Sequence, residues 1–412
     1  MELKKYNANH TKVLKINQIV HTVSETHRFD KDKLIAINTS DVENGVMGSG
    51  TLTSVDELKG QFKKAIVKDD ILFSEIRPAN RRFAKVTTED TKDYVVSTKL
   101  MVLRKYNEDV DLEYFYYCLT NQPFLDILQR RAENRIGSFP QITFDLLSEY
   151  AFPIPPISEQ KRISSVISTL DKKIALNRAI NQNLEAMAKQ LYDYWFVQFD
   201  FPNKEGKPYK SSGGEMLWND KLKREIPKGW NVAKLTDEIE LQYGFPFSTD
   251  LFTEQVTSVP VVRIRDILDN SISAYTTEEV EERYLLQKQD LLIGMDGNFH
   301  INYWTDNVSY LNQRSVRLRA KNNSNVSIVQ AKYDIQPYIK AKETRTKGST
   351  VGHLSDKDMK ELYVLVCPNE KAREKLDSIL SMIVKNRNEV TFLIKQRNEL
   401  LPLLMNGQII IE

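Results

Sequence analysis

Hydrophobic residues recur in alternating steps of four and three along residues 158–195, and charged residues fill most of the remaining positions. This period is typical of a helix that buries one narrow stripe along its length, as helices do in coiled coils. Pro153, Pro155 and Pro156 come just before it and predict an extended segment that leads into the helix. The stripe consists of Ile163, Ile167, Leu170, Ile174, Asn177, Asn181, Leu184, Ala188, Leu191 and Trp195.

The same period returns near the end of the chain, from Glu370 onward. Each helix would be roughly 50 Å long and could not bury its stripe alone, so we expect the two helices to pair. Because a whole globule connects the end of the first helix to the start of the second, the expected pairing is antiparallel. The alternative is two ordinary core helices within one large domain. The second stripe consists of Leu376, Leu380, Ile383, Arg387, Val390, Ile394, Arg397, Leu401 and Leu404.

Short apolar runs precede each long helix and predict strands, and in the first globule glycine and polar turns between them predict a twisted, mostly antiparallel sheet. Leu112–Leu119 and Gln122–Arg131 are expected to be helices. The sequence therefore predicts an α+β fold class, with two similar mixed α/β domains separated by a long antiparallel two-helix coiled coil and related by pseudo-two-fold symmetry. The predicted parts are domain 1 (1–155), a central helix (156–198), a connector rich in Pro, Gly, Lys and Ser (199–228), domain 2 (229–368), a C-terminal helix (369–405) and a tail (406–412).

The two domains look like a diverged internal repeat, because three pairs of short segments occur in the same order in both. Each match alone is weak, but their shared order at a nearly fixed offset favours a duplication. The pairs are Lys68–Leu72 with Lys288–Leu292, Lys99–Arg104 with Arg314–Arg319, and Arg135–Ser138 with Thr346–Ser349.

The composition is that of a globular protein, with 41% hydrophobic and 28% charged residues in 412. The chain contains no apolar run long enough to span a membrane, and its N-terminus is polar, so we expect neither a membrane segment nor a secretory signal. Cys118 and Cys367 fall in different domains and fit a reducing cytoplasm better than a disulfide framework.

Motifs for catalysis are missing from the sequence. The chain has no phosphate-binding loop, and its five histidines show no metal-ligand spacing. It also has no Asn/Asp-Pro-Pro-aromatic tetrapeptide, the motif that holds a flipped base for amino-methylation. We therefore expect no catalytic residue, no metal site and no cofactor in this chain.

Two clusters of basic residues point to DNA. Lys59 to Lys85 contain eight basic and three acidic residues, and Arg314 to Lys347 contain nine and two. Such clusters supply the local positive potential that displaces counterions from phosphates. They occupy corresponding parts of the two repeats, which favours DNA binding by both domains. The alternative for each single residue is a solvated basic surface.

Several segments resemble the specificity subunits of type I restriction–modification systems. Pro153–Ile163, Leu170–Ile174 and Asn183–Ala188 are similar to the central conserved region of that family. Three segments are similar to one of its recognition-domain types: Arg263–Asp266, Asp290–Gly297 and Leu311–Arg314. The second long helix departs from the family by carrying Arg387 and Arg397 in its stripe.

The resemblance implies a non-catalytic subunit with two target-recognition domains, each reading one part of a bipartite, asymmetric DNA sequence. It also implies assembly with two modification subunits, which bind S-adenosylmethionine and methylate adenine, and with restriction subunits, which cleave DNA using ATP and Mg. The expected location is the cytoplasm of a bacterium or archaeon. The target sequence and its spacer length do not follow from the resemblance.

Residues in matching places of the two domains are our candidates for DNA contacts. The choice rests on guanidinium and amide groups, which suit guanine and adenine edges, and on small residues that let a backbone approach phosphate. The candidates are Arg77, Asn80, Arg81, Arg82, Arg135, Gly137 and Ser138 in domain 1, and Asp296, Asn298, Gln313, Arg314, Arg345, Lys347 and Ser349 in domain 2.

Two other functions stay open at this point. A coiled-coil scaffold that binds proteins without reading DNA would show no salt-dependent affinity for DNA. An enzyme with an unrecognised site would use the carboxylates of Asp290 and Asp296, and substituting them would abolish an activity of the isolated chain.

Overall fold

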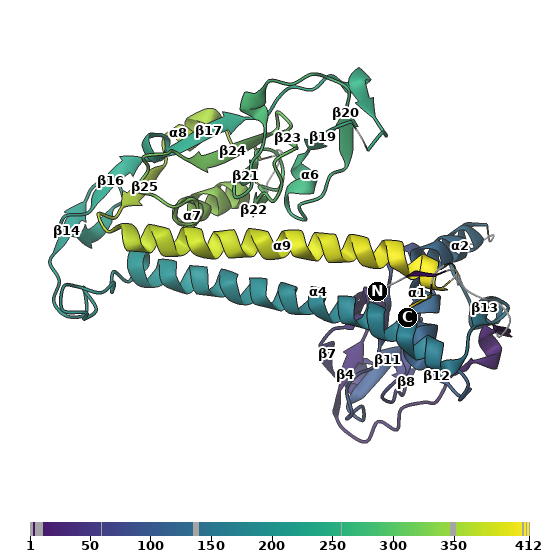
Figure 1. The fold of residues 1–412 in the computed structure, drawn as a ribbon. Coiled ribbons are helices and arrows are strands. Elements are labelled where there is room, and N and C mark those ends of the chain that lie inside the picture. Colours follow the sequence, from purple (N-terminus) through teal and green to yellow (C-terminus); the bar gives the residue numbers. More distant parts are fainter. Residues whose placement is uncertain are drawn as a thin grey trace. The chain divides into compact units, whose positions relative to one another are not determined.

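The chain forms two compact units (Figure 1). Unit 1 consists of Met1–Ile174 with Leu393–Glu412, and unit 2 of Ala175–Phe392. Two long helices, α4 (Ile157–Tyr192) and α9 (Glu370–Met405), each contribute one part to each unit. The computed structural model describes residues 3–4, 11–58, 60–134, 140–256, 258–346, 352–405, 408 and 410–411.

Two four-stranded sheets build unit 1. The first is antiparallel throughout and contains a strand, β9, whose side chains are all buried. In order, its strands are β10 (Phe83–Lys85), β9 (Ile71–Ser74), β12 (Leu100–Lys105) and β3 (Val20–Thr22). The second sheet consists of β7 (Thr51–Ser54), β4 (Lys33–Ile37), β11 (Tyr94–Ser97) and β8 (Phe62–Lys64). Its β4 and β11 are parallel, and the other strand pairs of the two sheets are antiparallel, as the prediction of a mostly antiparallel first domain requires.

Helices α1 (Leu112–Thr120) and α2 (Gln122–Glu133) follow these sheets in unit 1. The side chains of Asp111 and Asn121 accept hydrogen bonds from the first turns of α1 and α2, which explains where each helix begins. The smaller elements are β1 (Leu3–Lys4) with β26 (Ile410–Ile411), β2 (Lys12–Lys15) with β13 (Ala151–Ile154), β5 (Val42–Glu43) with β6 (Val46–Met47), and α3 (Phe144–Ser148).

The first sheet of unit 2 has the same strand order as that of unit 1, whereas the second sheet differs, because its parallel pair lies at the edge of the sheet and not in its centre. The first sheet is antiparallel and consists of β22 (Ile301–Tyr303), β21 (Leu291–Gly294), β24 (Ser315–Ala320) and β17 (Ile239–Tyr243). The second contains β18 (Phe252–Thr253), β20 (Ala274–Thr276), β19 (Val259–Val262) and β23 (Tyr310–Leu311), with β19 and β23 parallel. Other elements are β14 (Met216–Asn219) with β15 (Arg224–Pro227), β16 (Asn231–Lys234) with β25 (Tyr363–Val366), α5 (Leu235–Glu238), α6 (Ile264–Ile267), α7 (Ile328–Thr346) and α8 (Asp356–Lys360).

A buried ion pair holds the central strands of the first sheet together in both units. In unit 1 the fully buried Asp70 accepts two hydrogen bonds of 2.8 Å from Arg104. In unit 2 Asp290 accepts bonds of 2.6 and 2.7 Å from Arg319. The residue before each aspartate has a positive φ, 70° in one unit and 76° in the other. The first sheets of the two units therefore match down to the turn that precedes this aspartate.

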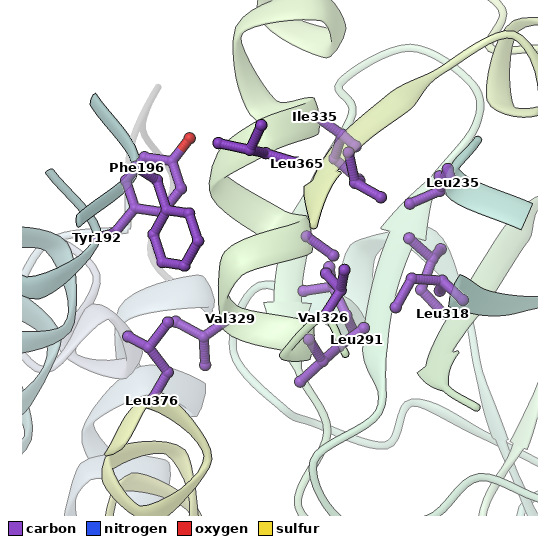
Figure 2. Packing of buried hydrophobic residues seen from close by; sticks show 14 of the residues in the cluster. Tyr192, Phe196, Leu235, Leu291, Leu318, Val326, Val329, Ile335, Leu365 and Leu376 are labelled. Carbon is purple, nitrogen blue, oxygen red and sulfur yellow. The ribbon is translucent and has the colours of Figure 1, made fainter. Parts of the chain in front are cut away.

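The core of unit 2 lies between the first sheet and helices α7, α4 and α9 (Figure 2). Leu291 and Leu318 of the sheet, Val329 of α7 and Leu376 of α9 are all buried in this one cluster. Burial of this kind contributes about 1.5–3 kcal/mol for each large aliphatic side chain. The packing fixes β21 and β24, whose ends carry the candidate DNA contacts.

Most stripe residues of the long helices are buried. Ile163, Ile167, Ile174, Leu184, Leu376, Leu380, Ile383 and Leu401 are buried, whereas Leu170, Leu191, Val390 and Ile394 are half-buried. Many of them pack against sheets and short helices as well: Ile163, Ile167 and Leu401 belong to the core of unit 1, and Leu184 and Leu376 to that of unit 2. Each helix end is thus part of a domain core.

The two arginines that interrupt the second stripe form ion pairs with the first helix. In unit 1 the Arg397 guanidinium lies 2.8 Å from the Asp171 carboxylate, and in unit 2 the Arg387 guanidinium lies 2.8 Å from that of Glu185. Their long side chains reach acidic residues beside the stripe of the first helix. The ion pairs offset the loss of apolar contacts at these two positions.

Candidate nucleic-acid interface

The same edge of the first sheet carries the candidate residues in both units. Beyond the end of β9, Ile76 bridges to Gln141, and the Arg77 amide donates to the Pro140 carbonyl at 3.1 Å. We call this region edge 1. Beyond the end of β21, Asp296 bridges to His353 in the same way. The Gly297 amide donates to the Gly352 carbonyl at 2.9 Å, and we call this region edge 2.

A two-residue turn before the neighbouring strand completes each edge. At edge 1 the turn contains Lys99, whose carbonyl accepts from the Glu75 amide at 3.1 Å. At edge 2 the turn contains Arg314, whose carbonyl accepts from the Met295 amide at 2.9 Å. Each sheet therefore brings three segments, far apart in sequence, to one place.

Edge 1 divides its predicted arginines into two groups. Arg81 donates to Asn44 at 2.7 Å and to Gln122 at 2.6 Å, and its burial lowers the pKa of the guanidinium. Arg82 donates to the Thr39 carbonyl at 2.7 Å. Both side chains are thus engaged within the protein. Arg77 and Asn80 are exposed, and neither side chain has a hydrogen bond to any residue that the structure describes.

The backbone around η5 (Pro78–Asn80) is held in an unusual conformation. Arg77 and Arg81 flank this single turn, and both have left-handed backbone angles, with φ of 47° and 53°. A non-glycine residue rarely adopts this conformation, which persists only where the surrounding structure enforces it. Ala79 is anchored to α2 by a hydrogen bond of 3.1 Å to Gln129. The turn therefore holds the backbone of Arg77 and Asn80 in a defined place, from which their side chains extend into solvent.

At edge 2 the acidic residue Asp296 lies between two basic side chains, those of His353 and Arg314. One oxygen of Asp296 lies 2.7 Å from Nδ1 of His353, and the other lies 3.4 Å from the Arg314 guanidinium. Arg314 keeps 67% of its side chain exposed. Asn298 and Gln313, the two predicted amides, are also exposed. The edge presents a guanidinium, an imidazole and two amides, groups that can bond to base edges or phosphates.

Gly244 lets two chain segments meet directly beneath the Arg314 turn. A Cβ atom at this position would lie 2.1 Å from the carbonyl oxygen of Asn312, so no other residue fits. Hydrogen bonds of 2.7 Å from Phe245 to Leu311 and of 3.0 Å from Gln313 to Phe245 tie the two segments together. The turn is therefore rigidly placed by the backbone beside it.

The remaining predicted contacts fall on segments without a described structure. Arg135, Gly137, Ser138, Lys347 and Ser349 lie outside the described residues, as does the side chain of Arg345. The described residues that follow these segments, Pro140 and Gly352, are those that bond to the ends of edge 1 and edge 2.

Catalytic and membrane roles gain no support from the geometry. Asp290, one of the two carboxylates considered for catalysis, is buried in its ion pair with Arg319 and is not accessible to a substrate. Among the described residues, no three His, Cys, Asp or Glu side chains gather closely enough to hold a metal. None of the described helices is long and apolar enough to cross a bilayer.

Two proteins of known family resemble this chain in sequence. A stretch of 178 residues is 43% identical to the type I restriction enzyme HindI specificity subunit of Haemophilus influenzae, and covers 42% of this chain and 39% of that protein. A longer stretch of 313 residues is 24% identical to the MjaIX specificity subunit of Methanocaldococcus jannaschii, and covers 73% of this chain and 69% of that protein. The first match thus spans well under half of the relative's length.

A solved structure shares the fold. The type I restriction–modification S subunit from M. genitalium superposes with a TM-score of 0.58 at 16% identity, covering 98% of both chains. The family model described as type I restriction modification DNA specificity domain matches this chain twice, at residues 11–186 and 227–400. The first match includes edge 1 and most of α4, and the second includes edge 2 and most of α9. The chain belongs to this family of non-catalytic DNA-specificity components.

Proposed function

We propose that this chain is the sequence-specificity subunit of a type I restriction–modification complex, in which unit 1 and unit 2 each read one half of a bipartite, asymmetric DNA target. The observation that carries the proposal is the repetition of one edge with different exposed side chains. Arg77 and Asn80 occupy edge 1, whereas Asn298, Gln313 and Arg314 occupy edge 2. Because the two edges have the same backbone arrangement but different exposed side chains, they suit a target whose two halves differ in sequence.

The exposed groups match the chemistry of base recognition. An arginine fork pairs with O6 and N7 of guanine, and an asparagine or glutamine amide pairs with N6 and N7 of adenine. Asp296 lies 3.4 Å from the Arg314 guanidinium and favours the orientations in which the two groups meet. A guanidinium that is already oriented toward the DNA loses less entropy on binding, so its two hydrogen bonds to guanine contribute more to affinity.

We further propose that α4 and α9 form an antiparallel pair that spaces the two half-sites. Support comes from the ion pairs Asp171–Arg397 and Glu185–Arg387. The pair with the higher residue number on α4 has the lower residue number on α9, as expected for helices that run in opposite directions. The amide of Asn181 also approaches the Ile383 carbonyl, at 3.4 Å. A spacer of roughly 50 Å corresponds to about 15 base pairs of unread DNA.

Disrupting this pair should change the dimensions of the chain in solution. Replacing Leu170 and Ile394 together by aspartate introduces two charges at half-buried stripe positions, where burial of an unpaired charge is unfavourable. We expect a larger radius of gyration in small-angle scattering. Leu176→Asp, at a position 61% exposed on α4, is the matched control. A double variant with the scattering profile of the control would contradict the pairing.

The partners follow from the family and from the two-fold repetition. We propose that two modification subunits, which bind S-adenosylmethionine, dock on the outward faces of the long helices, since two identical partners require a repeated surface. Restriction subunits, which use ATP and Mg, would complete the complex. No cofactor is assigned to this chain itself.

Direct DNA binding tests the proposal against the scaffold alternative. The full-length chain, co-expressed with its modification subunit, is titrated with a labelled 40-base-pair duplex of mixed sequence between about 0.05 and 0.2 M salt. We expect the logarithm of the affinity to fall linearly with that of the salt concentration, by about 0.9 for each phosphate contacted. An affinity that is absent or independent of salt would favour a protein-binding scaffold.

A further inference from the structure

Lys99 of unit 1 occupies the place that Arg314 holds in unit 2. Each is the second residue of a two-residue turn, and each turn leads into the strand that pairs with β9 or β21. The Lys99 amide donates to the Ser97 side chain at 3.3 Å, and the Arg314 amide donates to that of Asn312 at the same distance. Both carbonyls accept from the end of the central strand.

The surroundings leave the Lys99 ammonium group available. Lys99 is exposed, and its side chain has no hydrogen bond or ion pair with any residue that the structure describes. The adjacent acidic residue, Glu75, accepts a bond of 2.8 Å from Gln141 instead. Lys64, by contrast, donates to the carbonyls of Thr98 and Leu100, and its burial lowers the pKa of its ammonium group.

We propose that Lys99 is a DNA-contacting residue of unit 1 and that it binds a backbone phosphate, whereas Arg314 reads a base at the corresponding position of unit 2. This inference rests on the proposed function and deepens it. It adds a contact at edge 1, beside Arg77 and Asn80, and assigns different tasks to two residues in equivalent places.

The chemistry of the two side chains explains the different tasks. A lysine ammonium is a strongly hydrated point charge on a flexible stem, which attracts phosphate from many directions. An arginine fork pairs with guanine in one plane only, so it benefits from a neighbour that fixes it. Asp296 lies beside Arg314 and can act in this way, whereas the Glu75 carboxylate beside Lys99 already accepts from Gln141.

Matched lysine variants separate this role from that of an ordinary surface charge. Lys99→Gln removes the proposed contact, and Lys99→Arg retains the charge. Lys92→Gln is the control, because Lys92 is an exposed lysine in the turn before β11, whereas Lys99 lies in the turn after it. All variants are prepared as the full-length chain with its modification subunit, and their folding is compared by thermal unfolding.

The readouts are the salt dependence of affinity for the mixed 40-base-pair duplex and the sequence preference selected from a random duplex library. For Lys99→Gln we expect a salt slope about 0.9 smaller and an affinity lower by about 5- to 10-fold at 0.1 M salt, with an unchanged preferred sequence. Lys99→Arg should retain the wild-type slope. Arg314→Gln should relax the preference at one position of one half-site by about ten-fold or more.

The possible failures are distinguishable. If Lys99→Gln gives the same slope and affinity as Lys92→Gln while the wild-type complex binds DNA, Lys99 makes no phosphate contact and the inference is wrong. If Lys99→Gln alters the preferred base instead, the assignment to phosphate is wrong. If the wild-type complex itself binds no DNA, the proposed function fails first.

Discussion

Replacing Asp290 by asparagine is expected to lower the free energy of unfolding by about 2–4 kcal/mol. The substitution leaves the Arg319 guanidinium without its carboxylate partner in an interior where only 26% of the arginine side chain is exposed. It also weakens the cap on the turn before β21, where the Gln287 amide donates to Asp290 at 2.6 Å. This partial exposure of Arg319 keeps the expected loss below that of a fully buried pair.

Chemical denaturation of the full-length chain measures the effect. Asp70→Asn should cause a similar loss in unit 1, because Asp70 forms the same pair with Arg104 and the same turn cap with Val67. Glu205→Gln is the control, since its ion pair with Lys207 is exposed and should contribute less than about 0.5 kcal/mol.

The outcome also bears on the enzyme hypothesis. A double variant, Asp290→Leu with Arg319→Met, should recover much of the stability, because it removes both charges together. If Asp290→Asn were as stable as the wild type and abolished an activity of the isolated chain, the aspartate would be catalytic and its structural role would be refuted.

The long helices illustrate what periodicity can and cannot predict. The predicted segments 156–198 and 369–405 end within one residue of the helical runs, counting the turn Asp193–Val197 that continues α4. The pattern did not indicate why Arg387 and Arg397 interrupt the stripe. Their partners, Glu185 and Asp171, are about 200 residues away, and a sequence alone does not reveal such pairs.

Local signals were sufficient for some elements and not for others. The predicted helices Leu112–Leu119 and Gln122–Arg131 agree with α1 and α2 to within two residues, because Asp111 and Asn121 cap them. Helix α7 was not predicted, since it contains Pro337 and has no strongly one-sided apolar pattern. The parallel pairing of β4 with β11 joins strands about 60 residues apart and has no local signal.

Burial and hydrogen bonding divide the candidate residues in a way that the sequence did not indicate. Sequence patterns selected Arg81 and Arg82 on the same grounds as Arg77, but the groups that engage them, among them Asn44 and Gln122, come from other elements. Lys99, which we propose as a contact, was not among the sequence candidates, although the alignment of the two repeats paired it with Arg314. The position of Lys99 in the repeat could have pointed to it. The sequence candidates were instead selected because basic and amide residues cluster around them.

Methylation sequencing of DNA from cells that express this chain with its modification subunit tests the central claim most directly. The specificity role predicts methyl-adenine on both strands of one asymmetric, split motif, and loss of that methylation when this chain is omitted. A variant with Arg314→Gln should broaden only one half of the motif. Methylation that persists unchanged without this chain would contradict the specificity role and leave a protein-binding scaffold as the better account.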